Sequence, residues 1–318
     1  MKRIRDFLLK DEIDTTGTTN EVTPGTSILI KDVDLGFDNT TAYLKNLNLE
    51  VKQGELIAIV GEVGSGKSSL LSAILGEMYK LNNGTFNVNG SSAYVSQQAW
   101  IQNATVKDNI LFGKEYDEKI YNEIIQASCL ATDLNIMPAS DLTEIGEKGI
   151  NLSGGQKQRI SLARSLYSNS DIYFLDDPLS AVDSHVGKDL FDNVIGPNGL
   201  LNKKTRLFVT NSLSFLSQVD RIIMMHNGMI MEIGSYDELL RSAGKFSEFI
   251  RLYLNAKKSN QDDKVNESTE KTAKIKEIIQ VKSKTEVAGE KIIVKEKIES
   301  GKVFKLGNFI RIYTLYFN

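Results

Sequence analysis

A glycine-rich segment between an apolar run and a helix-like run constrains this chain more than any other stretch. Residues 61–68 read Gly-Glu-Val-Gly-Ser-Gly-Lys-Ser, a glycine, four free positions and then Gly-Lys-Ser. The apolar run 56–60 before them predicts a buried strand, and the run 67–75 after them predicts a helix. Strand, glycine loop and helix in this order form the context of the P-loop. The alternative is a glycine-rich turn with a surface lysine and no ligand, and this context argues against it.

The loop predicts a binding site for the phosphates of a nucleotide. Glycines let the backbone wrap closely around a polyphosphate, and the N–H groups at a helix N-terminus supply partial positive charge. The Lys67 ammonium is expected to reach the β- and γ-phosphates, and the Ser68 hydroxyl to ligate Mg²⁺. The predicted nucleotide-binding residues here are Gly61, Glu62, Val63, Gly64, Ser65, Gly66, Lys67, Ser68 and Ser69.

Composition excludes some classes of protein and predicts how the chain is divided into segments. The net charge of −3 at pH 7 gives no electrostatic support for nucleic-acid binding, and the single cysteine excludes an internal disulfide. No apolar run approaches the roughly 20 residues that a membrane-spanning helix needs, so we expect a soluble chain. Expected divisions are a connector at 1–25, a compact domain at 26–255, a charged disordered linker at 256–300 and an amphipathic segment at 301–318.

Apolar patterning outside the loop predicts alternating strands and helices. The expected strands are 28–30, 44–51, 84–88, 93–95, 172–175 and 206–209, with a hairpin of 222–225 and 229–231 turning at Asn227-Gly228. The expected helices lie mostly between 106 and 170, with one more over 236–254.

Two further segments carry chemistry. Leu152-Ser153-Gly154-Gly155-Gln156 opens a predicted helix, with Ser153 and Gln156 spaced as a capping box. A serine hydroxyl and free N–H groups at a helix N-terminus can also bind phosphate, so this helix start is a second candidate phosphate site. Residues 172–177 are an apolar strand that ends in Asp176 and Asp177, where a Mg²⁺-directing carboxylate is expected.

With these motifs in order, the sequence resembles the nucleotide-binding domain of ATP-binding cassette (ABC) transporters over about residues 26–255. Residues 98–102, Gln-Ala-Trp-Ile-Gln, and 177–183, Asp-Pro-Leu-Ser-Ala-Val-Asp, make it look most like the first such domain of the multidrug-resistance-associated branch, subfamily C. The corresponding motifs are the Walker A loop at 61–68, the Q-loop at Gln97, the signature at 152–156, the Walker B strand at 172–176, the D-loop at 180–183 and a loop toward the transmembrane domains at 143–149.

The resemblance implies a fold and several roles. The expected fold is α/β, a RecA-like P-loop core with an antiparallel β subdomain and a helical subdomain that carries the signature. ATP and Mg²⁺ are the expected ligands, with Ser68, Gln97 and Asp176 on the metal. Phe37 is expected to stack on adenine, and Tyr43 is the alternative. Signature residues Ser153, Gly154, Gly155 and Gln156 are expected to bind nucleotide, and Asp177, Asn211 and Gln97 to take the catalytic positions.

Two of those catalytic positions depart from the family. Asp177 stands where hydrolytic members have a glutamate, and its side chain is shorter by one C–C bond of about 1.5 Å. Since a misplacement near 1 Å can cost about 10²-fold in rate, we expect slow hydrolysis. Asn211 stands where the family has its switch histidine, and an asparagine can donate to a γ-phosphate but cannot carry a proton.

The resemblance predicts the ATP-binding domain of an exporter, with its own Walker site degenerate. Implied partners are a second nucleotide-binding domain, packed head-to-tail, and the transmembrane domains of the same transporter, on the cytosolic face of a membrane. A non-hydrolytic ATP-sensing domain of an ABC-type channel or channel regulator is the alternative. A soluble ABC ATPase of translation or DNA repair is a third hypothesis, weakened by the connector-like ends and the acidic net charge.

Overall fold

A computed structural model describes residues 4–5, 9, 24–146, 149 and 151–259 of the chain. Residues 1–250 form one compact unit and residues 251–318 another, and the architecture that follows is that of the first unit. The segments expected at 260–300 and 301–318 lie outside the described residues, as does most of the segment expected at 1–25. Among the described helices, none is both long and apolar enough to cross a bilayer.

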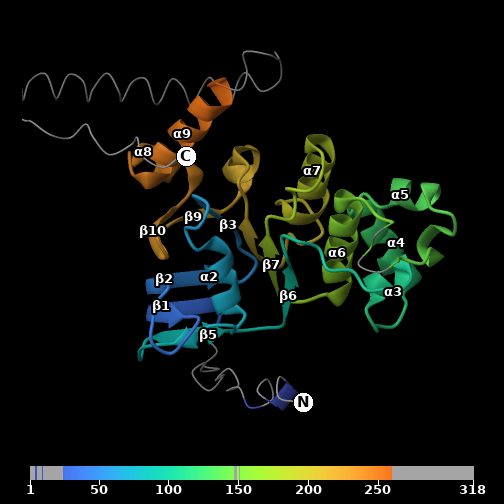
Figure 1. Cartoon of the computed structure of the whole chain (residues 1–318). Coiled ribbons are helices and arrows are strands. Elements are labelled where there is room, and N and C mark those ends of the chain that lie inside the picture. Colours follow the sequence, from blue (N-terminus) through green and yellow to red (C-terminus); the bar gives the residue numbers. More distant parts are fainter. Residues whose placement is uncertain (1–3, 6–8, 10–23, 147–148, 150, 260–318) are drawn as a thin grey trace, which may run out of the picture. The chain divides into compact units, whose positions relative to one another are not determined.

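A six-stranded sheet forms the centre of the unit, in the order β10-β9-β3-β8-β7-β6 (Figure 1). All neighbouring pairs are parallel except β10 with β9, which form an antiparallel hairpin. Every residue of β3, β7 and β8 is buried, as expected for strands of a parallel sheet covered on both faces. The strands are β3 (Leu56–Gly61), β6 (Ser92–Val95), β7 (Ile172–Asp176), β8 (Thr205–Val209), β9 (Arg221–His226) and β10 (Met229–Gly234).

A second, antiparallel sheet is built around one long strand, β1 (Thr26–Gly36), which pairs with three others. Its partners are β2 (Leu44–Lys52), β4 (Tyr79–Lys80) and β5 (Thr85–Val88). The strand predicted at 28–30 is therefore confirmed but too short. Val33 and Leu35 continue the buried face of β1, which carries the strand on to Gly36.

The helix α2 (Lys67–Ile74) follows the glycine loop and packs between the two sheets. Its buried residues, among them Leu70 and Leu71, share one hydrophobic core with Ile30 and Leu49 of the antiparallel sheet and Phe174 of the central sheet. Because this core packs against α2 from both sheets, the glycine loop lies between two packed elements, β3 and α2.

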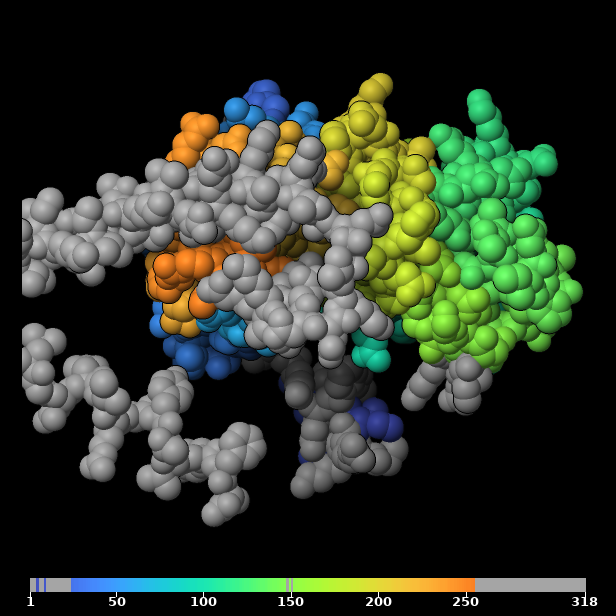
Figure 2. Space-filling view, turned by 90° about the horizontal axis from the view of Figure 1, so that it is seen from above, coloured from blue at the N-terminus to red at the C-terminus, as the bar shows by residue number. Residues whose placement is uncertain are grey.

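Between β6 and β7 the chain forms a separate helical region (Figures 1 and 2). It contains α3 (Val106–Leu111), α4 (Glu118–Ala127), α5 (Ala131–Ile136), the 3₁₀ turn η1 (Ser140–Leu142) and α6 (Gly154–Ser168). Figure 2 places the green surface of this region at the opposite end of the unit from the blue surface of the antiparallel sheet. The expected stretch of helices over 106–170 is confirmed, but non-helical residues separate its members. Residues 147–148 and 150 lie outside the described part.

Beyond β7 come α7 (Ser184–Leu190), the π-helical turn η3 (Phe191–Ile195) and the 3₁₀ helix η4 (Leu213–Gln218). Phe191 stacks on Phe215 with ring centroids 4.4 Å apart and contacts Phe208 of β8 at 6.0 Å. This aromatic cluster packs η3 and η4 against β8 of the central sheet.

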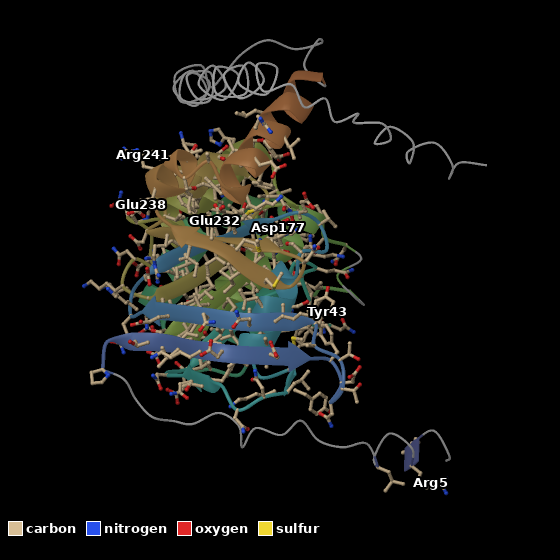
Figure 3. The ribbon with its side chains drawn as sticks, turned by 90° about the vertical axis from the view of Figure 1, so that its left-hand side faces the viewer. Arg5, Tyr43, Asp177, Glu232, Glu238 and Arg241 are labelled. Atoms are coloured by element: carbon tan, nitrogen blue, oxygen red, sulfur yellow. The ribbon has the colours of Figure 1, made fainter. Side chains whose placement is uncertain are left out.

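The single helix predicted over 236–254 is wrong. The structure has α8 (Tyr236–Arg241) and α9 (Lys245–Ser259), separated by Ala243 in a left-handed conformation with φ 55°. The cause is a long-range cap by Glu232 of β10, which is labelled in Figure 3. Its carboxylate accepts from the backbone N–H groups of Lys245 and Phe246, at 2.6 and 3.2 Å. A carboxylate at a new helix N-terminus satisfies two donors that a continuous helix would have paired internally.

Candidate nucleotide site

Four predicted site segments meet at one edge of the central sheet. Strand β3 leads into residues 61–69, β8 into Asn211, β7 into Asp176–Asp177 and β6 into Gln97. These four strands are neighbours and run parallel, so their carboxyl ends lie along the same edge. The order in which these strands pair could not be predicted from the sequence, and the sheet shows it.

The backbone of the loop 61–66 adopts conformations that favour glycine. Gly64 and Gly66 have φ values of 82° and 103°, in the left-handed region that favours glycine. An ideal Cβ on Gly64 would meet no atom within 4 Å, whereas one on Gly66 would lie 3.1 Å from Leu44 Cδ2. The space beside Gly64 is therefore open to a ligand, and Gly66 is confined by packing. Val63, at the tip, is 98% exposed.

Polar groups of the loop fit an anionic ligand. The Ser65 Oγ is buried and has no hydrogen-bond partner among the described residues. The N-cap of α2 is Gly66, which offers no side-chain acceptor to the first N–H groups of the helix, and no acidic residue occupies its first turn. Unpaired donors at a helix N-terminus form an anion-binding site. The loop thus has the groups that a polyphosphate requires.

Lys67 lies across the loop. Its Nζ donates to the carbonyl oxygens of Gly61 and Glu62, each at 2.9 Å. Burial lowers the pKa of Lys67, and the charges of Asp177 and Asp176 partly oppose that shift. Because desolvation penalises the ammonium form, an anion in the loop would be a favourable neighbour for it.

Two of the residues expected to bind Mg²⁺, Ser68 and Asp176, are hydrogen-bonded to each other. The Ser68 Oγ donates to Asp176 Oδ1 at 3.1 Å, which joins the P-loop helix to the end of β7. No group of three or more His, Cys, Asp or Glu side chains in the described part of the chain could hold a metal alone. A hydroxyl and one carboxylate suit Mg²⁺ that arrives with nucleotide phosphates, since this ion keeps water and phosphate oxygens among its ligands.

Tyr94 also contacts Asp176, a contact that the sequence did not predict. Its hydroxyl donates to Asp176 Oδ2 at 3.4 Å. Burial, followed by the charge of Asp176, raises the pKa of Tyr94 to about 12. Tyr94 is therefore a neutral donor that orients the carboxylate toward Ser68. Its position in β6, three residues before Gln97, was the available signal.

The two residues that depart from the family pattern bind each other. The Asn211 Nδ2 donates to Asp177 Oδ2 at 3.1 Å, between residues 34 apart in sequence. Asp177 is 8% exposed and has a φ of 47°, while its N–H donates to the Val209 carbonyl at 3.1 Å. Burial raises the pKa of Asp177, as does the neighbouring Asp176, while the Asn211 hydrogen bond and Lys67 lower it. The Asp177 carboxylate is thus buried, and the side-chain amide of Asn211 fixes its orientation.

Gln97 lies beyond the end of β6 and is exposed. The preceding carbonyl, of Ser96, accepts from Gln158 Nε2 of α6 at 3.2 Å. Gln158 is 2% exposed, and the sequence did not predict this link, because Gln158 and Ser96 lie far apart in the chain. The helix that carries the signature is therefore tied to the segment that carries Gln97.

Arg164 of α6 makes a second such link, which the sequence did not reveal. Its Nη1 donates to the Trp100 carbonyl at 2.8 Å and its Nη2 to Asn109 Oδ1 at 2.7 Å. The guanidinium also lies 5.1 Å from the centroid of the Trp100 ring, and burial lowers its pKa to about 10. Arg164 joins α3, α6 and the segment after Gln97.

The predicted signature stands at the N-terminus of α6. Ser153 and Gln156 form the expected capping box, with Ser153 N donating to Gln156 Oε1 at 2.9 Å. Asp133 of α5 accepts from Gln156 Nε2 at 3.1 Å and from Arg159 Nε at 3.0 Å, which fixes the helix start. No hydrogen bond within the described residues joins 153–156 to 61–69, and Ser153 and Gly154 are exposed.

Phe37 and Tyr43 share one exposed corner after β1 and before β2. Their ring centroids are 5.2 Å apart, and the side chains are 58% and 43% exposed. Exposed neighbouring aromatic rings offer a stacking surface, so both alternatives for adenine stacking lie at the same place.

Comparison with known proteins agrees with these features. The sequence model of the ABC transporter family matches residues 44–180. The chain is 48% identical over 270 residues to ATP-binding cassette sub-family C member 2 of Homo sapiens, covering 85% of the chain and 17% of that relative. It is 51% identical over 255 residues to sub-family C member 3 of Rattus norvegicus, covering 80% and 17%. With ABC transporter C family member 8 of Dictyostelium discoideum it shares 50% over 250 residues, covering 78% and 16%. The chain thus spans about a sixth of the length of these relatives.

Proposed function

The chain belongs to the ABC transporter family through an ATP-binding domain of the subfamily C type, and from that premise we propose that it binds Mg-ATP at residues 61–69 and cleaves it slowly. The observation that carries the proposal is the junction of the P-loop helix with the end of β7, where Ser68 Oγ lies 3.1 Å from Asp176 Oδ1. In this domain the phosphates occupy the open space beside Gly64. The unpaired Ser65 hydroxyl and the Lys67 ammonium bind them there. Ser68, Asp176 and Gln97 would hold Mg²⁺, which would neutralise phosphate charge.

Slow cleavage follows from the side chains that face the γ-phosphate. Asp177 is shorter than the glutamate of hydrolytic members by one C–C bond, about 1.5 Å. Its carboxylate also accepts from Asn211 at 3.1 Å, which directs both side chains toward each other. Since a misplacement of about 1 Å can cost about 10²-fold, a water held by Asp177 reacts slowly. The site is thus suited to keep ATP intact.

The chain spans 17% of the length of these mammalian relatives. The role of this domain in a complete transporter is therefore also a proposal. We infer that the domain serves an exporter at the cytosolic face of a membrane. There it closes head-to-tail on a second nucleotide-binding domain, and its signature completes the site of that partner. The exposed start of α6 supports this, as does the lack of a described hydrogen bond between 153–156 and the chain's own P-loop. Closure can be driven only by ATP that binds the closed state more tightly.

An ATP-sensing domain of a channel or channel regulator is the second candidate. The Asn211–Asp177 hydrogen bond favours it, since a site that binds without cleaving suits a sensor. Rapid ATP turnover in the complete protein would favour the exporter, and ATP-dependent gating without turnover would favour the sensor.

Thermal stabilisation by ATP tests the binding site. A ligand at 100 times its Kd stabilises the native state by about 2.7 kcal/mol, which raises the unfolding temperature. We expect this shift in the wild-type chain and its loss in Lys67→Ala, because that variant removes the cation of the loop. Lys119→Ala, at an exposed position of α4, is the matched control and should keep the shift. An unchanged shift in Lys67→Ala would contradict the assignment of the loop.

A further inference from the structure

The turn of the β9–β10 hairpin, Asn227-Gly228, packs against the glycine loop from the side. Asn227 and Gly228 have φ values of 48° and 74°, the left-handed pair typical of a two-residue Asn-Gly hairpin turn. The Gly228 N–H donates to the Ser65 carbonyl at 2.9 Å, and the Gly228 carbonyl accepts from the Lys45 N–H at 3.0 Å. One residue of the hairpin therefore bonds to the P-loop with one backbone group and to the start of β2 with the other.

Steric contact leaves this arrangement little freedom. An ideal Cβ on Gly228 would lie 2.1 Å from the Tyr43 carbonyl oxygen, so no side chain fits there unless the backbone moves. On the loop side, a Cβ on Gly66 would lie 3.4 Å from Gly228 Cα, and one on Gly61 would lie 2.4 Å from the Met225 carbonyl oxygen. Backbone packs directly on backbone between the hairpin, the P-loop and β2.

The two surfaces that Gly228 joins are those expected to bind opposite ends of ATP. Ser65 belongs to the phosphate loop. Tyr43, labelled in Figure 3, belongs to the exposed aromatic pair with Phe37. We propose that Gly228 is a positioning residue of the nucleotide site, which fixes the spacing between the phosphate loop and the adenine-stacking corner. This role rests on the proposed function. A site preformed at the right spacing binds more tightly because less ordering is needed on binding.

Gly228→Ala tests the role, with Gly113→Ala as its matched control. Gly113 has a φ of 83°, close to that of Gly228, but an added Cβ there meets no atom within 4 Å. Both variants place alanine in a left-handed backbone, and only Gly228→Ala adds the clash with Tyr43. We expect Gly228→Ala to weaken ATP binding by about tenfold or more, and Gly113→Ala to stay within about twofold of wild type. Equal affinities in the two variants would overturn the positioning role.

Amide hydrogen exchange in the wild type supplies a measurement that needs no variant to fold. If the hairpin supports the binding-competent loop, ATP must stabilise the hairpin in return. Mg-ATP should therefore slow exchange in peptides covering 226–230 as well as 61–69. Slowing at 61–69 with none at 226–230 would overturn the positioning role alone. A wild type that neither binds ATP nor slows at 61–69 would overturn the proposed function, and the positioning role with it.

Discussion

At the scale of single residues, the charge state of the site depends on the neighbours of Asp177. Its carboxylate is buried, lies beside Asp176, accepts from Asn211 and faces Lys67. Burial has the largest effect, so its pKa lies above the ordinary value. A carboxylic acid whose pKa is raised by folding stabilises the protein below its unfolded pKa, and this contribution is lost as the pH rises through the folded pKa.

Asp177→Asn should therefore raise the thermal unfolding temperature of the nucleotide-free chain at neutral pH. The amide oxygen still accepts from Asn211, and the buried charge is gone. The advantage should shrink as the pH falls and vanish below about pH 3, under the unfolded pKa of aspartate, where wild-type Asp177 is protonated in both states. Unfolding temperatures measured across this range check the sign.

Asp171→Asn is the control with the opposite sign. Hydrogen bonds from Ser91 N and Oγ, at 2.9 and 2.7 Å, lower the pKa of Asp171. Its ionised form stabilises the fold above the unfolded pKa, so the variant should lose stability at neutral pH and approach wild type as the pH falls. A loss of stability in both variants at neutral pH would contradict the account of Asp177.

At the scale of elements, the start of α6 separates a structural from a functional role of the signature. The Ser153 Oγ accepts from Gln156 N at 3.2 Å, while Ser235 plays the same part for Glu238 at the start of α8. Loss of an N-cap serine costs about 1 kcal/mol of stability. Replacing either serine should therefore lower the free energy of unfolding by a similar amount.

Ser153→Ala and Ser235→Ala should each lower the free energy of unfolding by about 1 kcal/mol and leave ATP affinity of the isolated chain unchanged. Only Ser153→Ala should slow hydrolysis by a partner domain, because we propose that the signature completes the partner's site. Denaturant unfolding and ATP titration measure the first two effects. Weaker ATP binding by isolated Ser153→Ala would mean that the signature belongs to the chain's own site.

Elements with strong local signals could be predicted from the sequence, and long-range contacts could not. The strands at 56–60 and 172–175 and the capping box at Ser153 were confirmed, because burial pattern and capping chemistry are local. The break at Ala243 was missed because its cause, Glu232, acts from another element. The Asn211–Asp177 hydrogen bond was missed for the same reason. Both residues were singled out, yet only the strand order brings them together.

At the scale of the whole molecule, we propose that the nucleotide site of this chain is half of a composite site. The described residues place 61–69 and 153–156 on separate elements without a hydrogen bond between them. A partner's signature is therefore expected to cap the phosphates bound here. Cleavage then depends on three things: Lys67 to hold the γ-phosphate, the side chains at 177 and 211 to direct the water, and the partner to close the site.

Restoring both departures should raise the rate of hydrolysis only when the site is closed. Asp177→Glu adds the missing carbon, and Asn211→His supplies a group that contacts the γ-phosphate. Together they should raise turnover by about 10²-fold in the presence of a partner domain with an intact signature. The gain should vanish when Lys67→Ala is added, since all three side chains act on the same phosphate.

The most direct test is the fate of ATP on the domain, measured as ADP formed per bound nucleotide over time. The wild-type chain should retain bound ATP almost entirely intact, alone or with its partner. The Asp177→Glu, Asn211→His variant should form ADP only with the partner. Rapid ADP formation by the wild-type chain alone would contradict the account, as would a double variant that stays as slow as wild type beside its partner.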